Sequence, residues 1–459
     1  MKRIYILIAL SLVCLRSPAQ EAHFHVKFSE PLAVFQFLDY LSANAPQNVF
    51  KTAFDNSPYN VDKYKRLITE YDQLDLDYGY EYTAYPYAQK IGGSTASLLK
   101  RNLVNSSSIN EFKLASLGII PNADLFKLCD LLTTFEPVYQ ALVYQPCKEK
   151  FDRQLGAISS LADSGKLSRF FDLGLKFYHS SWDEQTPFIV ALYPLAGTLH
   201  FTATAFYNNA EVAVPVDLQD DDKLISVTIH EIFHILYDEE SIDFKKNIEN
   251  AFKNNPSRDS RYAYLLLNEA LATTLGNGYV YGQLKGVEDT GAWYRRIYTN
   301  LMAKAIYPLV KTYITEGKSL DKDFIDHYIQ IFDRNFAGWL RKKDFIMADR
   351  YVIADNPDSL NLVDQRYPYR SMSAYEPEIT TVSIEKMKQA PITKIAIVSK
   401  DNKQALALIK GEFNELSDWQ PDSRKDFSYA VFLADKTYLI ILNNVTGNTA
   451  DQLERLTLQ

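Results

Sequence analysis

Glycine, cysteine and positive charge are all scarce in this sequence, and each shortage excludes something. Glycine supplies 17 of 459 residues, and so few turn glycines favour a helix-rich chain over a many-turned β-sandwich. The formal net charge of −8 argues against a nucleic-acid partner, because neutralising phosphates requires a basic surface. The sequence has no Cys-x-x-Cys pair, so we expect no zinc site built on cysteines. It also lacks the phosphate-binding Gly-x₄-Gly-Lys-Ser/Thr and the nucleophile pattern Gly-x-Ser-x-Gly.

The first nineteen residues have the pattern of a secretory signal peptide. Lys2 and Arg3 precede an apolar run over residues 4–15 that is too short to span a bilayer, and the small residue Ala19 follows. We therefore expect cleavage near Ala19 and export to the periplasm or the extracellular space. The mature chain is then expected to be more acidic than the full sequence and to contain no transmembrane segment.

The three cysteines raise two further questions. Lipid attachment at Cys14 is an alternative to simple cleavage, but the bulky Val13 stands where a lipoprotein signal has a small residue. Cys129 and Cys147 would remain in the mature protein, and an oxidising compartment allows them to form one disulfide. Nothing in their spacing shows that they meet, so the disulfide stays open.

Hydrophobic periodicity indicates an α+β fold with helices in the majority and a small mixed sheet. After residues 1–19, we expect a mostly helical region over 20–180. A region of strands followed by helices, over 181–350, contains the motif described below. A proline-rich linker and a small α/β unit follow over 351–459.

Individual strands and helices are predicted from local patterns. Pro215 marks the segment 211–216 as an edge strand, because proline cannot donate a ladder hydrogen bond. The glycines between 276 and 286 are expected to cap and turn the chain after a helix. Strands are expected at 23–28, 188–193, 200–206, 211–216 and 393–398, a helix at 402–409, and a hairpin from 429–433 and 438–442.

The segment 227–236 contains His-Glu-x-x-His in the helical setting that this motif requires. Residues four apart share one face of a helix, so His230 and His234 can present two imidazoles to one ion. Glu231 stands beside them and can reach a water molecule without binding the metal. Aspartates at 220–222 cap the predicted helix, and its apolar flanks predict burial. The alternative is a pair of core histidines hydrogen-bonded to their neighbours.

A catalytic zinc site normally has a third protein ligand, and two acids compete for that role. Asp238 continues the row of His230 and His234, but ligands on three successive turns would span about 11–12 Å, too far for one ion. Asp238 is therefore expected to be a supporting or surface acid. Glu269 interrupts an apolar helix predicted over 262–275, where a carboxylate must be paired or bind a metal.

His-Glu-Ile-Phe-His followed by Leu-Asn-Glu-Ala-Leu-Ala resembles the glutamate-zincin metallopeptidases (gluzincins), the group of thermolysin and aminopeptidase N. The resemblance covers only the segment around the zinc site. It implies a zincin-like catalytic region over 181–350, with His230, His234 and Glu269 as Zn²⁺ ligands and Glu231 as general base. The gap between histidines and glutamate is longer than in those enzymes, and no aminopeptidase Gly-x-Met-Glu-Asn segment is present. The supporting aspartate of thermolysin is replaced by Thr273.

The sequence thus predicts an exported zinc metallopeptidase acting on a peptide or protein substrate, an endopeptidase rather than an exopeptidase. A non-catalytic exported binding module and a zinc hydrolase of a non-peptide amide are the alternatives. The resemblance implies a downstream histidine or tyrosine that stabilises the oxyanion, and Tyr307, His327 and Tyr328 are the candidates. An extended substrate could also add to the edge strand expected at 211–216.

Overall fold

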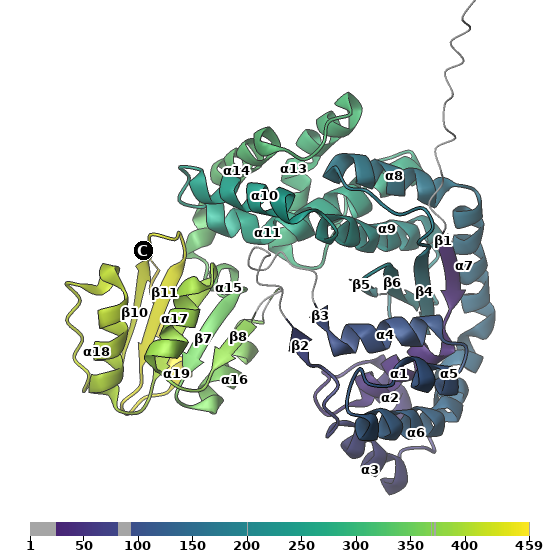
Figure 1. Ribbon diagram of the computed structural model, residues 1–459, viewed down its shortest axis with the longest axis horizontal. Helices are drawn as coiled ribbons and strands as arrows, with labels where there is room; N and C mark the ends of the chain where they lie inside the picture. Colours follow the sequence, from purple (N-terminus) through teal and green to yellow (C-terminus); the bar gives the residue numbers. More distant parts are fainter. Residues whose placement is uncertain (1–23, 81–92, 200, 369, 371–372, 459) are drawn as a thin grey trace, which may run out of the picture.

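The computed structural model describes residues 24–80, 93–199, 201–368, 370 and 373–458 (Figure 1). The predicted signal peptide and Cys14 lie outside the described residues. The chain has the expected α+β fold, in which helices surround two small mixed sheets. Within the described residues, no helix combines the length and hydrophobicity that crossing a membrane demands.

The first sheet has four strands in the order β1-β4-β6-β5. The strands are β1 (Phe24–Phe28), β4 (Phe188–Leu195), β5 (Thr202–Phe206) and β6 (Asn209–Pro215), close to the four predicted segments. The first three in the sheet order run parallel, and β5 pairs antiparallel with β6. Because β1 pairs with β4, the sheet crosses the boundary predicted at residue 180.

The prediction that residues 211–216 form an edge strand was wrong, since β6 lies inside the sheet and β5 is at its edge. Pro215 removes no hydrogen bond between β5 and β6, because of where it lies in the strand. Pro215 is the last residue of β6, whereas β5 pairs with β6 only from Asn209 to Ala213. The missing N–H therefore falls beyond the β5 ladder.

Helices cover both faces of this sheet, which explains why β4 is a continuous apolar run. Val190 and Leu192 belong to one core cluster, and Ile189 and Ala191 belong to another on the opposite face. The second cluster is built with α1 (Glu30–Leu41), α2 (Val49–Asp55), α3 (Asp62–Tyr71), α4 (Thr95–Asn105), α5 (Ile109–Ala115), α6 (Asn122–Tyr139) and the π-helical η1 (Gln140–Tyr144). A two-stranded ribbon, β2 (Gly79–Tyr80) and β3 (Gly93–Ser94), precedes α4.

The helices that follow η1 share the core cluster on the other face of the sheet, which contains Val190 and Leu192. They are α7 (Gln145–Asp163), α8 (Lys166–Tyr178), α9 (Asp221–Asp238), α10 (Ile242–Asn254), α11 (Ser260–Ala272), the π-helical η2 (Thr273–Val280), α12 (Tyr281–Lys285), α13 (Ile297–Glu316), α14 (Lys322–Phe336), η3 (Ala337–Arg341) and α15 (Lys343–Ile346). Helix α9 packs directly against α8, α11 and η2.

A second, five-stranded sheet forms the C-terminal unit in the order β10-β11-β9-β7-β8 (Figure 1). The predicted strand β9 (Thr393–Val398), helix α18 (Asn402–Glu412) and hairpin of β10 (Phe427–Phe432) with β11 (Tyr438–Asn443) are confirmed. The prediction missed two strands and several helices. These are β7 (Arg350–Ala354), β8 (Ser373–Glu376), α16 (Pro357–Arg366), α17 (Thr381–Gln389), η4 (Asn414–Leu416) and α19 (Thr449–Arg455).

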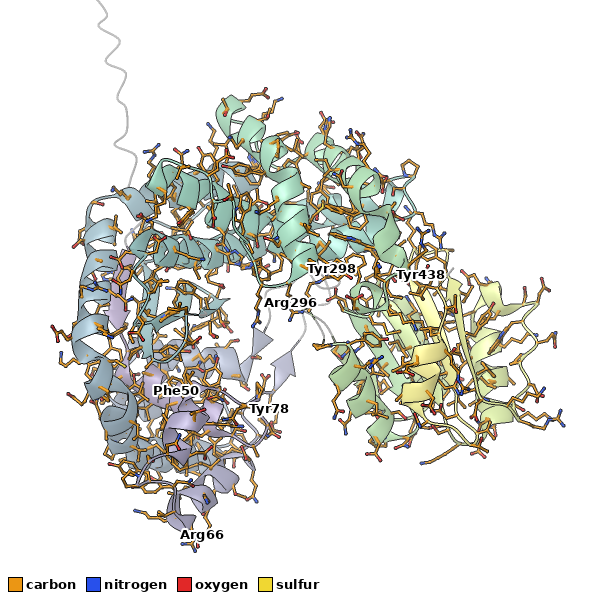
Figure 2. The ribbon with its side chains drawn as sticks, turned by 180° about the vertical axis from the view of Figure 1, so that it is seen from behind. Phe50, Arg66, Tyr78, Arg296, Tyr298 and Tyr438 are labelled. Carbon is orange, nitrogen blue, oxygen red and sulfur yellow. The ribbon has the colours of Figure 1, made fainter. Side chains whose placement is uncertain are left out.

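The C-terminal unit is fixed against α11, which holds the predicted third ligand. The hydroxyl of Tyr262 on α11 is hydrogen-bonded to Thr393 Oγ1 at 2.8 Å. It also accepts the backbone N–H of Tyr438 at 3.1 Å, at the junction of the two regions (Figure 2). Apolar residues of both regions form one continuous core cluster, so the second sheet supports the helix from behind.

Candidate metal centre

Helix α9 begins and is buried as its sequence predicts. The side chain of Asp220 accepts the backbone N–H of Lys223 at 3.2 Å and caps the helix. Two further aspartates lie in the first turn, where negative charge is favourable. His230 is only 4% exposed and Glu231 only 9%, so the motif is held inside the protein.

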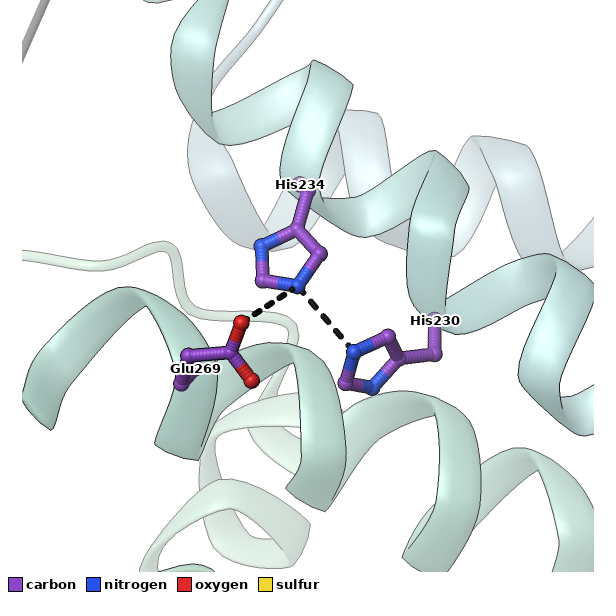
Figure 3. Close-up of side chains that lie close together, drawn as sticks. All are labelled: His230, His234 and Glu269. Atoms are coloured by element: carbon purple, nitrogen blue, oxygen red, sulfur yellow. Dashed lines mark hydrogen bonds and ion pairs between the residues drawn. The ribbon is translucent and has the colours of Figure 1, made fainter. Parts of the chain in front are cut away.

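Three predicted metal ligands converge from two helices, α9 and α11 (Figure 3). Nε2 of His234 lies 3.0 Å from Nε2 of His230 and 3.4 Å from Oε1 of Glu269. In a tetrahedral zinc site with ligand distances of about 2.1 Å, ligand atoms lie about 3.4 Å apart. One offered atom of each residue lies within 4.8 Å of the others, so small side-chain adjustments suffice.

The remaining polar atoms of these side chains support a bound cation. Oε2 of Glu269 is buried and has no hydrogen-bond partner among the described residues. A buried carboxylate oxygen without a partner costs free energy unless a ligand compensates it. Two imidazole nitrogens that face each other at 3.0 Å cannot both carry a proton, whereas both can donate lone pairs to one metal ion. The residues therefore fit a metal ion.

The charges of the three side chains are strongly coupled. Burial and the neighbouring His234 lower the pKa of His230 to about 3, so this imidazole is neutral. Burial disfavours a charge on His234, but the Glu269 carboxylate outweighs it and raises the pKa to about 10. Burial alone would raise the pKa of Glu269, yet the charge of His234 holds the pKa of the Glu269 carboxyl group well below the usual range. Metal binding would displace the proton from His234.

The orientation of His234 comes from the residue before the glutamate. Nδ1 of His234 lies 2.8 Å from Oδ1 of Asn268, which fixes the ring with Nε2 facing the centre. Nδ2 of Asn268 in turn donates to Asp238 at 3.5 Å. Asp238 thus supports the centre without being a ligand, in agreement with the prediction, and Thr273 plays no such part.

Glu231 lies next to the three predicted ligands and is not part of their group. Its Oε1 is 4.0 Å from Nε2 of His230. Burial raises the pKa of Glu231 to about 7, so the carboxyl group can both accept and release a proton near neutral pH. This agrees in position with the predicted general base.

Tyr294, which the sequence did not single out, lies over the centre. Its ring stacks on His230 with centroids 5.9 Å apart and an angle of 20° between planes. Its hydroxyl interacts with Glu269 and helps to lower the pKa of that carboxyl group. Burial and the charge of Glu269 raise the pKa of Tyr294, so the hydroxyl stays protonated and able to donate.

Tyr294 belongs to the loop between α12 and α13, and its neighbour Trp293 anchors that loop. The Trp293 backbone N–H donates to Oδ1 of Asn300 at 2.8 Å, and its indole N–H donates to the carbonyl of Asp289 at 2.8 Å. The indole packs so tightly on Gly278 that a Cβ there would lie 2.6 Å from the ring. In the sequence, the aromatic pair 293–294 after the glycine cluster was the feature that could have pointed to Tyr294.

The three candidates for the oxyanion donor lie elsewhere, and this expectation was wrong. The ring of Tyr307 packs against Trp293 with centroids 5.1 Å apart. His327 is exposed and bonds a backbone carbonyl of its own helix at 2.7 Å. Tyr328 is fully buried and donates to the carbonyl of Ala263 at 3.1 Å. None of the three lines the cavity at the centre.

The glycine cluster was only partly interpreted correctly. Gly286 has a left-handed conformation (φ 72°) and caps α12, as expected. Gly276, however, lies inside η2, where the π-helical turn crosses α9. A Cβ on Gly276 would lie 2.7 Å from the Cα of His230, so only glycine lets the two helices approach so closely.

A cavity of about 360 Å³ opens at the centre. Its walls include the three predicted ligands, Glu231 and Tyr294, together with part of the edge strand β5.

Cys129 and Cys147 are both buried and both free, so they do not form the disulfide that the sequence left open.

No protein-family model, curated protein or solved structure matches this chain.

Proposed function

We propose that this protein is an exported zinc-dependent peptidase, with His230, His234 and Glu269 holding the metal and Glu231 acting as general base. The observation that carries the proposal is the convergence of these side chains from two helices inside an open cavity. Export rests on the signal-peptide pattern of the first nineteen residues.

The protein groups around the centre have separable roles in such a reaction. Zinc would supply Lewis acidity, polarising a carbonyl group and making a water molecule acidic near neutral pH. Glu231 would accept the proton of the attacking water and deliver it to the leaving amine. The hydroxyl of Tyr294 would donate a hydrogen bond to the carbonyl oxygen as negative charge develops on it. Asn268 keeps His234 oriented throughout.

The edge strand β5 favours a peptide over another amide as the substrate. Ala203, Thr204 and Ala205 line the cavity, and among the described residues β5 is bonded to β6 on one side only. An extended peptide adding to this free edge would pass along the centre with its carbonyl groups at regular spacing. Such a chain of main-chain hydrogen bonds requires a polypeptide substrate.

The donor count favours a catalytic over a structural role for the metal. The candidate group contains three ligands, and no fourth His, Cys, Asp or Glu joins it within the described parts of the chain. Structural zinc sites are closed by four protein ligands, whereas catalytic sites keep a position open. The open cavity therefore supports an enzyme rather than a binding module.

The test uses the mature protein and one matched pair of variants. Wild type is expected to bind one zinc per chain and to hydrolyse unstructured peptides. Glu231→Gln should keep the zinc and lose at least about 10²-fold in turnover, because it removes the proton acceptor alone. Glu184→Gln, a change in an exposed loop, should match wild type. Equal turnover by Glu231→Gln would refute the proposal.

A further inference from the structure

Tyr294 reaches the centre from a loop without regular secondary structure. The loop follows Gly286, which caps α12, and ends at Arg296, the residue before α13 (Figure 2). A side chain on a loop is placed only as precisely as its backbone, and the polar groups of that backbone need partners from elsewhere in the fold. The hydrogen bonds of the loop backbone therefore decide how accurately the Tyr294 hydroxyl faces Glu269.

Two asparagine side chains hold the peptide group that joins Trp293 to Tyr294. Nδ2 of Asn277 donates a hydrogen bond to the carbonyl oxygen of Trp293 at 2.7 Å. The N–H of Tyr294 donates to Oδ1 of Asn300 at 3.4 Å, and the same oxygen accepts the N–H of Trp293 at 2.8 Å. The carbonyl and the N–H of this peptide group are thus both bonded to side chains, one from η2 and one from α13.

Asn277 lies between the two glycines through which η2 makes close contacts. Gly276 lies against the backbone of His230, and Gly278 lies against an indole ring, that of the loop residue before Tyr294. Short π-helical turns occur frequently at functional sites. Here one residue of the turn contacts the metal helix and the next two contact the tyrosine loop, so η2 connects the two sides of the centre.

The other end of the Asn277 carboxamide shows that the hydrogen bond to the loop explains this residue. Oδ1 of Asn277 is buried and has no hydrogen-bond partner among the described residues. A buried oxygen without a partner costs free energy, so an apolar side chain of similar size would suit the position better if only packing mattered. Within the described part of the chain, the contact that asparagine adds is the one to the Trp293 carbonyl.

We infer that Asn277 and Asn300 are positioning residues for the proposed reaction, and that they keep Tyr294 where its hydroxyl can donate to the developing oxyanion. The inference rests on the proposed peptidase function and explains how its oxyanion donor is held. Because η2 also contacts His230, one helical segment sets the distance between this donor and the metal ligands.

The first test is a double-mutant cycle on kcat, measured with the zinc-loaded mature protein and unstructured peptides. Asn277→Ala should lower kcat by about tenfold with KM and zinc content near wild type, because the misplaced hydroxyl acts only in the transition state. In the Tyr294→Phe background the same change should lower kcat by less than about twofold, because no hydroxyl is left to position. An equal loss in both backgrounds would overturn the inference.

Asn300 provides a second variant with its own rescue. Asn300→Ala removes the acceptor and should also lower kcat by about tenfold. Asn300→Asp keeps an oxygen there, in a part of α13 where negative charge is favourable, and should retain at least about half of the wild-type kcat. A kcat for Asn300→Asp as low as that of Asn300→Ala would contradict the assignment.

The matched control is Asn105→Ala. Asn105 is exposed at the end of α4, and its Nδ2 also donates to a backbone carbonyl, that of Arg101 at 2.8 Å. This variant should match wild type in kcat, KM and zinc content, because it removes the same kind of hydrogen bond far from the centre.

A second measurement requires no turnover. The zinc-loaded mature protein with 3-fluorotyrosine at position 294 alone is observed by ¹⁹F NMR, where stacking on His230 shifts the resonance away from that of free fluorotyrosine. Asn105→Ala should keep this shift. Asn277→Ala and Asn300→Ala should lose at least about half of it, because the ring is no longer held on the imidazole. An unchanged resonance in both variants would overturn the inference.

The two measurements together distinguish this inference from the proposed function. If wild type cleaves no peptide while the resonance moves in both alanine variants, the peptidase proposal fails and the positioning of Tyr294 stands. If wild type cleaves peptides while kcat and the resonance stay unchanged in Asn277→Ala and Asn300→Ala, the positioning fails and the peptidase stands.

Discussion

Replacing Gly276 by alanine should damage the metal centre without touching a ligand. The new Cβ would lie 2.7 Å from both Cα and Cβ of His230 and 2.9 Å from its backbone nitrogen. Carbon atoms in ordinary contact are about 3.5–4.0 Å apart, so the two helices must separate by about 1 Å. Helical backbone cannot rotate out of the way as a flexible side chain can.

The two contributions to stability have opposite signs. Overpacking of this kind costs about 1–3 kcal/mol, and the better helix propensity of alanine returns at most about 1 kcal/mol. We expect a net loss on the order of 1–2 kcal/mol in the free energy of unfolding. The displaced His230 imidazole should weaken zinc binding by about 10–100-fold.

Denaturant unfolding and zinc competition with a chelator would measure both effects. The control is Gly156→Ala on α7, where a Cβ meets nothing within 4 Å. That variant should be slightly more stable than wild type and should bind zinc equally well. If Gly276→Ala unfolds at the wild-type midpoint and keeps the wild-type zinc affinity, the close approach of η2 to His230 has no role in building the centre.

Three other predictions concern single side chains. Asn268→Ala should lower zinc affinity by about 10–100-fold, measured by chelator competition, because Nδ1 of His234 loses its partner, and an unchanged affinity would exclude Asn268 from positioning His234. Tyr294→Phe should reduce kcat by about 10²-fold in steady-state assays while zinc content and KM stay near wild type, and an unchanged kcat would exclude the hydroxyl from the reaction. Cys129 and Cys147 should react with a thiol reagent only after unfolding, without prior reduction, and mass spectrometry that finds them bridged would contradict the structure.

The sequence predicted the parts of the site that depend on local chemistry. The aspartate cap and apolar flanks place His230 and His234 on one face of a buried helix, whatever lies around it. Glu269 was recognisable because a carboxylate amid apolar helix residues needs a partner. The strands β4 and β9 were likewise recognisable from continuous apolar runs, which are typical of strands covered on both faces.

The parts that failed depend on contacts between distant segments. Whether Pro215 ends an inner or an edge strand is decided by the pairing of β5 with β6, which no local pattern records. Gly276 looks like a helix terminator in sequence, and only the crossing with α9 shows that it is a contact point inside a π-helical turn. Tyr294 is placed by the packing of Trp293 on Gly278, so its position over His230 follows from tertiary structure alone.

The claim that this chain is a zinc enzyme is tested most directly by anomalous diffraction at the zinc edge from crystals of the mature protein. The account predicts one strong peak within bonding distance of Nε2 of His230, Nε2 of His234 and Glu269, with an open position facing the cavity. Zinc-soaked crystals with no peak between these side chains, or with a peak closed by a fourth protein ligand, would contradict it.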